Sequence, residues 1–197
     1  MAIASVNAGT PKEYGAEQNL VSLTSPDFKN TTVRTDNNSN SFAPAFKWDS
    51  TDGYTIGVTH AHPAGGAPSP ADVFWMLEQV AGYNGPLYNA SAADKKFFKD
   101  NSSITVVAEN VSFVVTVRDW TALEQLYYDG TATPENYQNA VWGYLATHPF
   151  ESQADATAYT LLNLFGDTIN LYHAGYGSTY FMPINATSGT VSNTPCQ

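Results

Sequence analysis

The stretch Tyr54–Asp72, YTIGVTHAHPAGGAPSPAD, decides how the chain is interpreted. Its first half alternates along the chain with a period of two, which predicts a β-strand with His60 and His62 on the same face. Residues two apart on a strand are separated by roughly 6.5–7 Å, so two such imidazoles can lean onto one metal ion. Pro63 ends the expected strand, and a loop of small residues follows it.

A helix is expected to begin directly after this loop. Ser69 at the N-cap, a proline at the first helical position and Asp72 in the first turn form a strong helix-start pattern. Capping alone explains these residues. Placed after the strand, however, they bring a carboxylate beside the two imidazoles. This gives a candidate set of three metal ligands, His60, His62 and Asp72, with a fourth position open for water.

The order HxHP, small-residue loop and SxxD resembles the JAMM signature of the JAB/MPN metalloprotease family. The elements after it are similar in pattern to the bacterial toxin-associated branch of that family. The resemblance implies Zn2+ as the cofactor, bound by the two histidines and Asp72, with Ser69 helping to hold the oxyanion and a glutamate on an earlier strand as general base. The loop Pro63–Pro68 is one residue shorter than is usual in the family.

Glu13 and Glu17 are the only glutamates before the motif. They lie an even number of positions apart, so on one continuous strand they would face the same way. Glu13 is the favoured base because its Glu-Tyr-Gly setting looks more like the glycine-bearing strand around the base of the family. Glu17 is the alternative base. For either residue, a solvated carboxylate near a terminus is the competing interpretation.

The composition is that of a globular domain. The chain has 197 residues, of which 43% are hydrophobic, and we expect a single JAB/MPN-like domain over residues 1–185 and a flexible tail over residues 186–197. Eight Lys and Arg against eighteen Asp and Glu give a formal net charge of −10. A chain this acidic offers no basic patch for nucleic acid.

Other features bear on where the chain acts. The lone Cys196 can form no internal disulfide. The sequence has no apolar run long enough to span a membrane, and its start lacks the features of a signal peptide. The low charged fraction of 13% is more usual for secreted or cell-surface bacterial proteins. We therefore expect such a location, reached as part of a longer chain or by another route.

The remaining patterns predict alternating strands and amphipathic helices. Hairpins are expected over residues 104–117 and 168–184, and helices over residues 119–128, 133–148 and 152–166. Residues 13–23 and 42–48 offer strands before the motif. The fold class is therefore α+β (α/β/α-like), a mixed central β-sheet flanked by helices. The resemblance implies a JAB/MPN-like (cytidine-deaminase-like) architecture.

Three functions follow from these features. The first is a zinc-dependent hydrolase, a JAMM-type metallopeptidase, that cleaves a peptide or isopeptide (amide) bond of a protein or peptide substrate, as an exported effector or toxin domain. The alternative is a catalytically inactive JAB/MPN-like domain that serves as a protein-interaction scaffold. The third is an unrelated phosphoesterase or amidohydrolase, which needs further ligands on later strands. His148 and His173 lie outside convincing ligand patterns and are expected to be structural.

Overall fold

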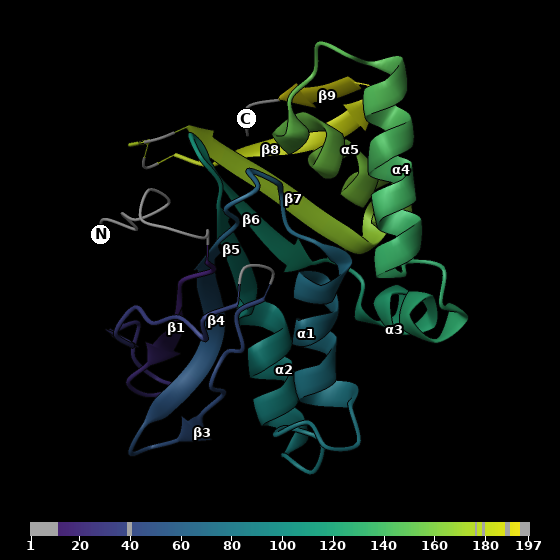
Figure 1. Cartoon of the computed structure of the whole chain (residues 1–197). Coiled ribbons are helices and arrows are strands. Elements are labelled where there is room, and N and C mark those ends of the chain that lie inside the picture. Colours follow the sequence, from purple (N-terminus) through teal and green to yellow (C-terminus); the bar gives the residue numbers. More distant parts are fainter. Residues whose placement is uncertain (1–11, 39–40, 176, 179, 188–189, 194–197) are drawn as a thin grey trace.

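The computed structural model describes residues 12–38, 41–175, 177–178, 180–187 and 190–193 (Figure 1). The strands are β1 (Gly15–Leu20), β2 (Phe28–Asn30), β3 (Trp48–Asp49), β4 (Gly53–Ala61), β5 (Ser103–Val107), β6 (Val111–Val117), β7 (Ile169–Gly175), β8 (Met182–Thr187) and β9 (Thr190–Asn193). The helices are α1 (Pro70–Ala81), α2 (Ala92–Asn101), α3 (Trp120–Asp129), α4 (Pro134–Thr147), α5 (Gln153–Phe165) and the 3-10 helix η1 (Gly166–Thr168).

The strands form one mixed sheet in the order β2-β1-β4-β5-β6-β7-β8-β9, with β3 pairing beside β4. All neighbours are antiparallel except β4 and β5, which are parallel. The link between those two strands contains α1 and α2, since parallel strands need a long crossover. The five α-helices flank this sheet (Figure 1). The predicted class, a mixed sheet flanked by helices, is confirmed at this level.

The core lies between the sheet and the helices that pack on it. Its fully buried members come from both layers and include Val58, Val73, Met76, Ile104, Val115, Leu123, Leu161 and Leu171. On α1 the buried positions repeat at helical spacing, as the sequence pattern predicts. Burial of this face holds the N-terminal end of α1 against the end of β4.

Most predicted elements occur at their expected places, with four differences. Helix α2 was not predicted, because its residues are mostly polar and only Phe98 is fully buried. Strand β2 was also not predicted. Residues 42–48 keep the alternation of partly buried and exposed side chains, but of the predicted strand only Trp48 belongs to a strand. Within the predicted tail, residues 186–187 and 190–193 pair in β8 and β9.

Register between β1 and β4 decides which side chains can meet. Gly15 lies opposite His60, and Glu17 lies opposite Val58. Because directly opposed residues of an antiparallel pair project to the same side, Glu17 shares a face with Val58 and His60 of β4. Glu13 lies just before β1, where its backbone amide donates to the Asn38 carbonyl.

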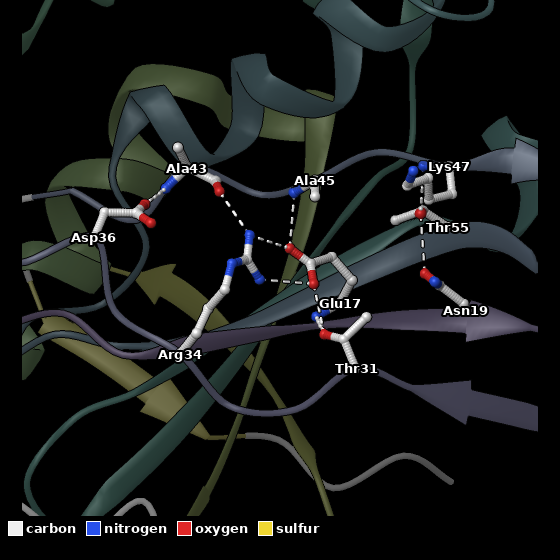
Figure 2. A network of polar contacts seen from close by, with 9 residues as sticks. All are labelled: Glu17, Asn19, Thr31, Arg34, Asp36, Ala43, Ala45, Lys47 and Thr55. Atoms are coloured by element: carbon white, nitrogen blue, oxygen red, sulfur yellow. Dashed lines mark hydrogen bonds and ion pairs between the residues drawn. The ribbon is translucent and has the colours of Figure 1, made fainter. Parts of the chain in front are cut away.

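Glu17 is the centre of a buried polar network (Figure 2). Its side chain is 1% exposed and forms an ion pair with Arg34 at 2.7 Å. Thr31 Oγ1 donates to it at 2.5 Å, and the backbone amide of Ala45 donates at 2.7 Å. Burial acts to raise the Glu17 pKa, but the hydrogen bonds from these three donors outweigh it and hold the pKa below its ordinary value of 4.5. Glu17 therefore fastens the segment after β2 to the sheet.

We expect Glu17→Gln to lower the free energy of unfolding by about 2–3 kcal/mol near neutral pH, because the donors around it lose a charged acceptor. Since the folded pKa lies below 4.5, this contribution is present above that pH and is lost as the pH falls through the folded pKa. Urea unfolding of wild type and variant over the acid range measures the difference. A stability gap that stays constant on acidification would contradict this role.

The described helices include none long and apolar enough to cross a bilayer.

Candidate metal centre

Two imidazoles meet at the end of β4. His60 and His62 lie two positions apart, and their Nε2 atoms approach to 3.1 Å. The His60 side chain is 6% exposed and that of His62 is 16% exposed. Two ring nitrogens this close need a shared proton or a shared cation, because two lone pairs facing each other repel.

The first turn of α1 brings a carboxylate to the same point. Ser69 is the N-cap and Asp72 is the third helical residue, and each accepts a hydrogen bond from the other's backbone amide. One oxygen of Asp72 lies 3.0 Å from His60 Nε2, and the other lies 3.7 Å from His62 Nε2. The structure therefore brings together the three side chains that the sequence proposes as ligands.

The spacing of these atoms fits a tetrahedral metal ion. Zinc bonds of about 2.0–2.1 Å place two ligand atoms about 3.3–3.4 Å apart. His60 Nε2 lies 3.1 Å from His62 Nε2 and 3.0 Å from Asp72 Oδ1, both within about 0.4 Å of that value, whereas the 3.7 Å contact of His62 Nε2 is to the other carboxylate oxygen, Oδ2. The same contacts also have a purely structural interpretation, in which a protonated His60 pairs with Asp72 and Ser69 only caps α1.

Glu13 is the second carboxylate at the site. Among the described residues, Glu13, His60 and His62 form a group that could itself hold a metal ion, because each offers one ligand atom and these atoms all lie within 4.8 Å of one another. The residue is 6% exposed, and burial raises its pKa to about 7, with His60 acting to lower it and Asp72 acting to raise it further. A carboxyl with a pKa near 7 can both accept and return a proton at neutral pH.

The other three groups titrate as a coupled cluster. Burial disfavours the charged form of Asp72, but His60 and its hydrogen bond, with help from His62, hold the Asp72 pKa well below its ordinary range. Burial also acts against His60, and the charge of Asp72 overcomes it and raises the His60 pKa. For His62 burial prevails, so its pKa is lowered. The site thus holds Asp72 as a carboxylate and keeps His62 neutral, the forms that bind metal, while the raised pKa of His60 favours a proton that a metal ion would have to displace.

Glu17, the alternative base, lies away from this cluster. It is on the predicted face, but its carboxylate is engaged by Arg34, Thr31 and Ala45. Its lowered pKa makes it a poor proton acceptor at neutral pH. Of the two glutamates, only Glu13 reaches the histidines among the described residues.

Ser69 lines the same pocket, but its hydroxyl is already hydrogen-bonded to Asp72. Its hydroxyl donates to Asp72 Oδ2 at 2.7 Å and accepts from the Asp72 amide at 3.4 Å. The Ser152 and Asp155 pair at the start of α5 makes the same two hydrogen bonds, far along the chain from any HxH motif. The expected capping roles of both serines are therefore seen, and a catalytic role for Ser69 requires a change of partner.

Helices α4 and α5 hold the loop between His62 and Asp72 in place. The backbone amide of Ala67 donates to Thr157 Oγ1 of α5 at 2.8 Å. The hydroxyl of Tyr137 of α4 lies 3.5 Å from the Pro68 carbonyl and 3.4 Å from that of Thr157. Sequence reasoning missed both residues, because a threonine and a tyrosine inside amphipathic helices carry no signal beyond core packing.

The site opens into a pocket of 530 Å³. Residues 41–44 form one wall, α1 from Ser69 to Glu78 forms another, and parts of α3 and α4 complete it. The described lining residues are mostly apolar, with three acidic side chains, Glu13, Asp72 and Glu78, and no lysine or arginine. Such a pocket favours neutral or cationic ligands over phosphates and carboxylates.

His148 and His173 lie outside this site, as the sequence suggests. His148 caps α4 and stacks on Tyr144 with ring centroids 4.2 Å apart. His173 lies on β7 opposite Phe113. Neither belongs to the candidate metal group found among the described residues.

Comparisons with protein-family models, with curated proteins and with solved structures give no significant match. The geometry of the site is therefore what supports a function for this chain.

We expect Glu13→Gln to stabilise the metal-free protein, the opposite of Glu17→Gln. The folded pKa of Glu13 is about 7 against an ordinary 4.5, so its ionisation opposes folding. That penalty is absent below pH 4.5, grows as the pH rises towards 7 and is complete above it. The gain for the glutamine variant is about 2–3 kcal/mol in mildly alkaline buffer with chelator. Thermal unfolding over this range checks it, and a variant less stable than wild type above neutral pH would refute the assignment.

Proposed function

We propose that this chain is a zinc-dependent hydrolase that cleaves an amide bond, peptide or isopeptide, in a protein or peptide substrate. His60, His62 and Asp72 would hold the ion, and Glu13 would act as general base. The observation that carries the proposal is the convergence of the His60 and His62 imidazoles, 3.1 Å apart, with the Asp72 carboxylate, whose two oxygens lie 3.0 Å from His60 and 3.7 Å from His62, beside a carboxyl with a pKa of about 7.

A JAB/MPN-like architecture belongs to the same proposal. It is supported by the order of the elements: a glutamate just before β1, the HxH strand β4 beside it, a short loop, and a helix that supplies the aspartate in its first turn. The loop is one residue shorter than in the family, yet Asp72 still contacts both histidines. The shorter loop therefore does not separate the ligand set.

The zinc ion and the side chain of Glu13 would have different parts in the reaction. A zinc ion at this site would act as a Lewis acid and lower the pKa of a water molecule towards about 7. Glu13 would take a proton from that water and deliver it to the leaving amine nitrogen, while the hydroxyl adds to the carbonyl carbon and the C–N bond breaks. The pocket would exclude water from the remaining faces of the substrate.

Two observations favour this function over its rivals. A phosphoesterase would need cations for its substrate, and no lysine or arginine is among the described residues that line the pocket. In an inactive scaffold, nothing would favour a buried carboxyl whose ionisation opposes folding. Glu13 is such a carboxyl, because burial raises its pKa. The choice of an amide among neutral carbonyl substrates rests on the resemblance to the JAMM signature.

Metal analysis with a turnover assay tests the proposal. We expect wild type to bind about one zinc per chain, His62→Ala to lose it, and Glu13→Gln to retain it while losing hydrolysis of labelled casein by at least about 100-fold. His148→Ala, which removes a histidine outside the site, is the matched control and should keep the zinc. Equal zinc content in wild type and His62→Ala would end the metal hypothesis. Full turnover in Glu13→Gln would show that Glu13 is not the base.

A pair of serine variants tests whether Ser69 does more than cap α1. We expect Ser69→Ala and Ser152→Ala each to lose about 1 kcal/mol of stability, because both serines make the same N-cap hydrogen bonds. Only Ser69→Ala should also lower kcat, by about 100-fold if the hydroxyl stabilises the oxyanion. Stability follows from urea unfolding and kcat from casein hydrolysis. Equal kcat in the two variants would leave Ser69 as a cap alone.

A further inference from the structure

The ring of Phe42 lies across a row of three neighbouring residues, Arg34, Gly15 and His60, at the edge of the candidate metal centre. Gly15 of β1 pairs with His60 on one side and forms an isolated bridge with Arg34 on the other. The Phe42 ring stacks near the His60 ring, with centroids 6.4 Å apart and planes 18° apart. The Arg34 guanidinium lies 4.6 Å from the centre of the same ring. One aromatic ring thus spans the row from the cation to the imidazole.

The middle of this row must be glycine. A Cβ at Gly15 would lie 2.6 Å from two atoms of the Phe42 ring, closer than carbon atoms can approach. The nearest atoms belong to a rigid ring, so the ring would have to move. Glycine at this position therefore allows Phe42 to sit directly on β1, and the pairing of Gly15 with His60 fixes the ring beside the site.

Hydrogen bonds with side chains hold the backbone on the C-terminal side of Phe42 in place. The Ala43 amide donates to Asp36 Oδ2 at 2.7 Å, and the Ala43 carbonyl accepts from Arg34 at 2.9 Å (Figure 2). Two residues on, the Ala45 amide donates to Glu17. Figure 2 shows Arg34 between Glu17 and Ala43, in contact with both. Arg34 therefore fixes both the ring of Phe42, through its guanidinium, and the backbone next to it.

Phe42 also lines the pocket of the candidate metal centre. Phe42 is only partly buried, and it lines the pocket together with Pro44, Glu13 and His60. These neighbours offer an apolar surface within the same cavity as the groups proposed to cleave the substrate. No lysine or arginine lines it among the described residues, and the nearby Arg34 guanidinium is already engaged by Glu17 and the Ala43 carbonyl.

We propose that Phe42 forms an apolar subsite that takes a bulky apolar side chain next to the cleaved bond, and that Arg34 and Gly15 position it. The inference rests on the proposed function, because it places the substrate in the pocket of the candidate metal centre. Phe42 is then a specificity-determining residue, and Arg34 and Gly15 act through it without touching the substrate.

Peptide binding to the zinc-loaded full chain carrying Glu13→Gln tests the subsite without turnover. The probes are the blocked peptides Ac-Ala-Ala-Phe-Ala-Ala-NH2 and Ac-Ala-Ala-Ala-Ala-Ala-NH2, titrated by calorimetry. We expect the phenylalanine peptide to bind at least about tenfold more tightly, as burial of a phenyl ring implies. Adding Phe42→Ala should reduce that ratio to below about threefold.

Gly15→Ala and Arg34→Met should lower the same ratio while Phe42 itself is retained. Phe150→Ala, which removes a fully exposed phenylalanine elsewhere, should leave it unchanged. Because the ratio compares two peptides on one sample, partial unfolding of a variant lowers the amount of competent protein but not the ratio. A destabilised fold alone therefore does not mimic the loss of the subsite.

Equal binding of the two peptides, no binding of either, or a ratio that survives Phe42→Ala would overturn the inference. Zinc content and casein hydrolysis, measured in parallel on the chain with Glu13 intact, separate it from the proposed function. Hydrolysis that persists without a Phe42-dependent ratio refutes the subsite alone. A Phe42-dependent ratio without hydrolysis refutes the proposed catalysis and leaves the subsite standing.

Discussion

The contact of Asp72 with two imidazoles is the interaction on which the rest of the site depends. It joins the end of β4 to the first turn of α1. These two elements follow one another in the sequence and are connected by the loop over residues 62–69. Packing of α1 on the sheet sets the helix position, and Thr157 holds the intervening loop from α5. Because these supports come from distant parts of the chain, the three ligand atoms are positioned by the whole fold.

The two glutamates near β1 show how environment separates chemical roles. Both are buried and both are carboxyls, but Glu17 has Arg34, Thr31 and a backbone amide to satisfy it, whereas Glu13 faces another carboxylate and an imidazole. Their pKa values move in opposite directions for this reason. Glu17 stabilises the segment that carries Phe42, and Glu13 retains a proton affinity suited to neutral pH.

The sequence predicts the local parts of this site and not the distant ones. A period of two around His60 and His62, followed by a helix start at Ser69, is enough to place the candidate ligands together. The sequence favours Glu13 over Glu17 only through its Glu-Tyr-Gly setting, and the physical reason, the partners that engage Glu17, appears only in the three-dimensional structure. The support from Thr157 and the packing of Phe42 on Gly15 both depend on contacts between segments far apart in sequence, which periodicity cannot encode.

Anomalous diffraction at the zinc edge, from a crystal grown with zinc, tests the central claim most directly. We expect one strong peak between β4 and α1, about 2.0–2.2 Å from Nε2 of both histidines and from a carboxylate oxygen of Asp72. Glu13 should lie outside bonding distance of that peak. No peak at this position, or a peak bound by Glu13 in place of Asp72, would contradict the account.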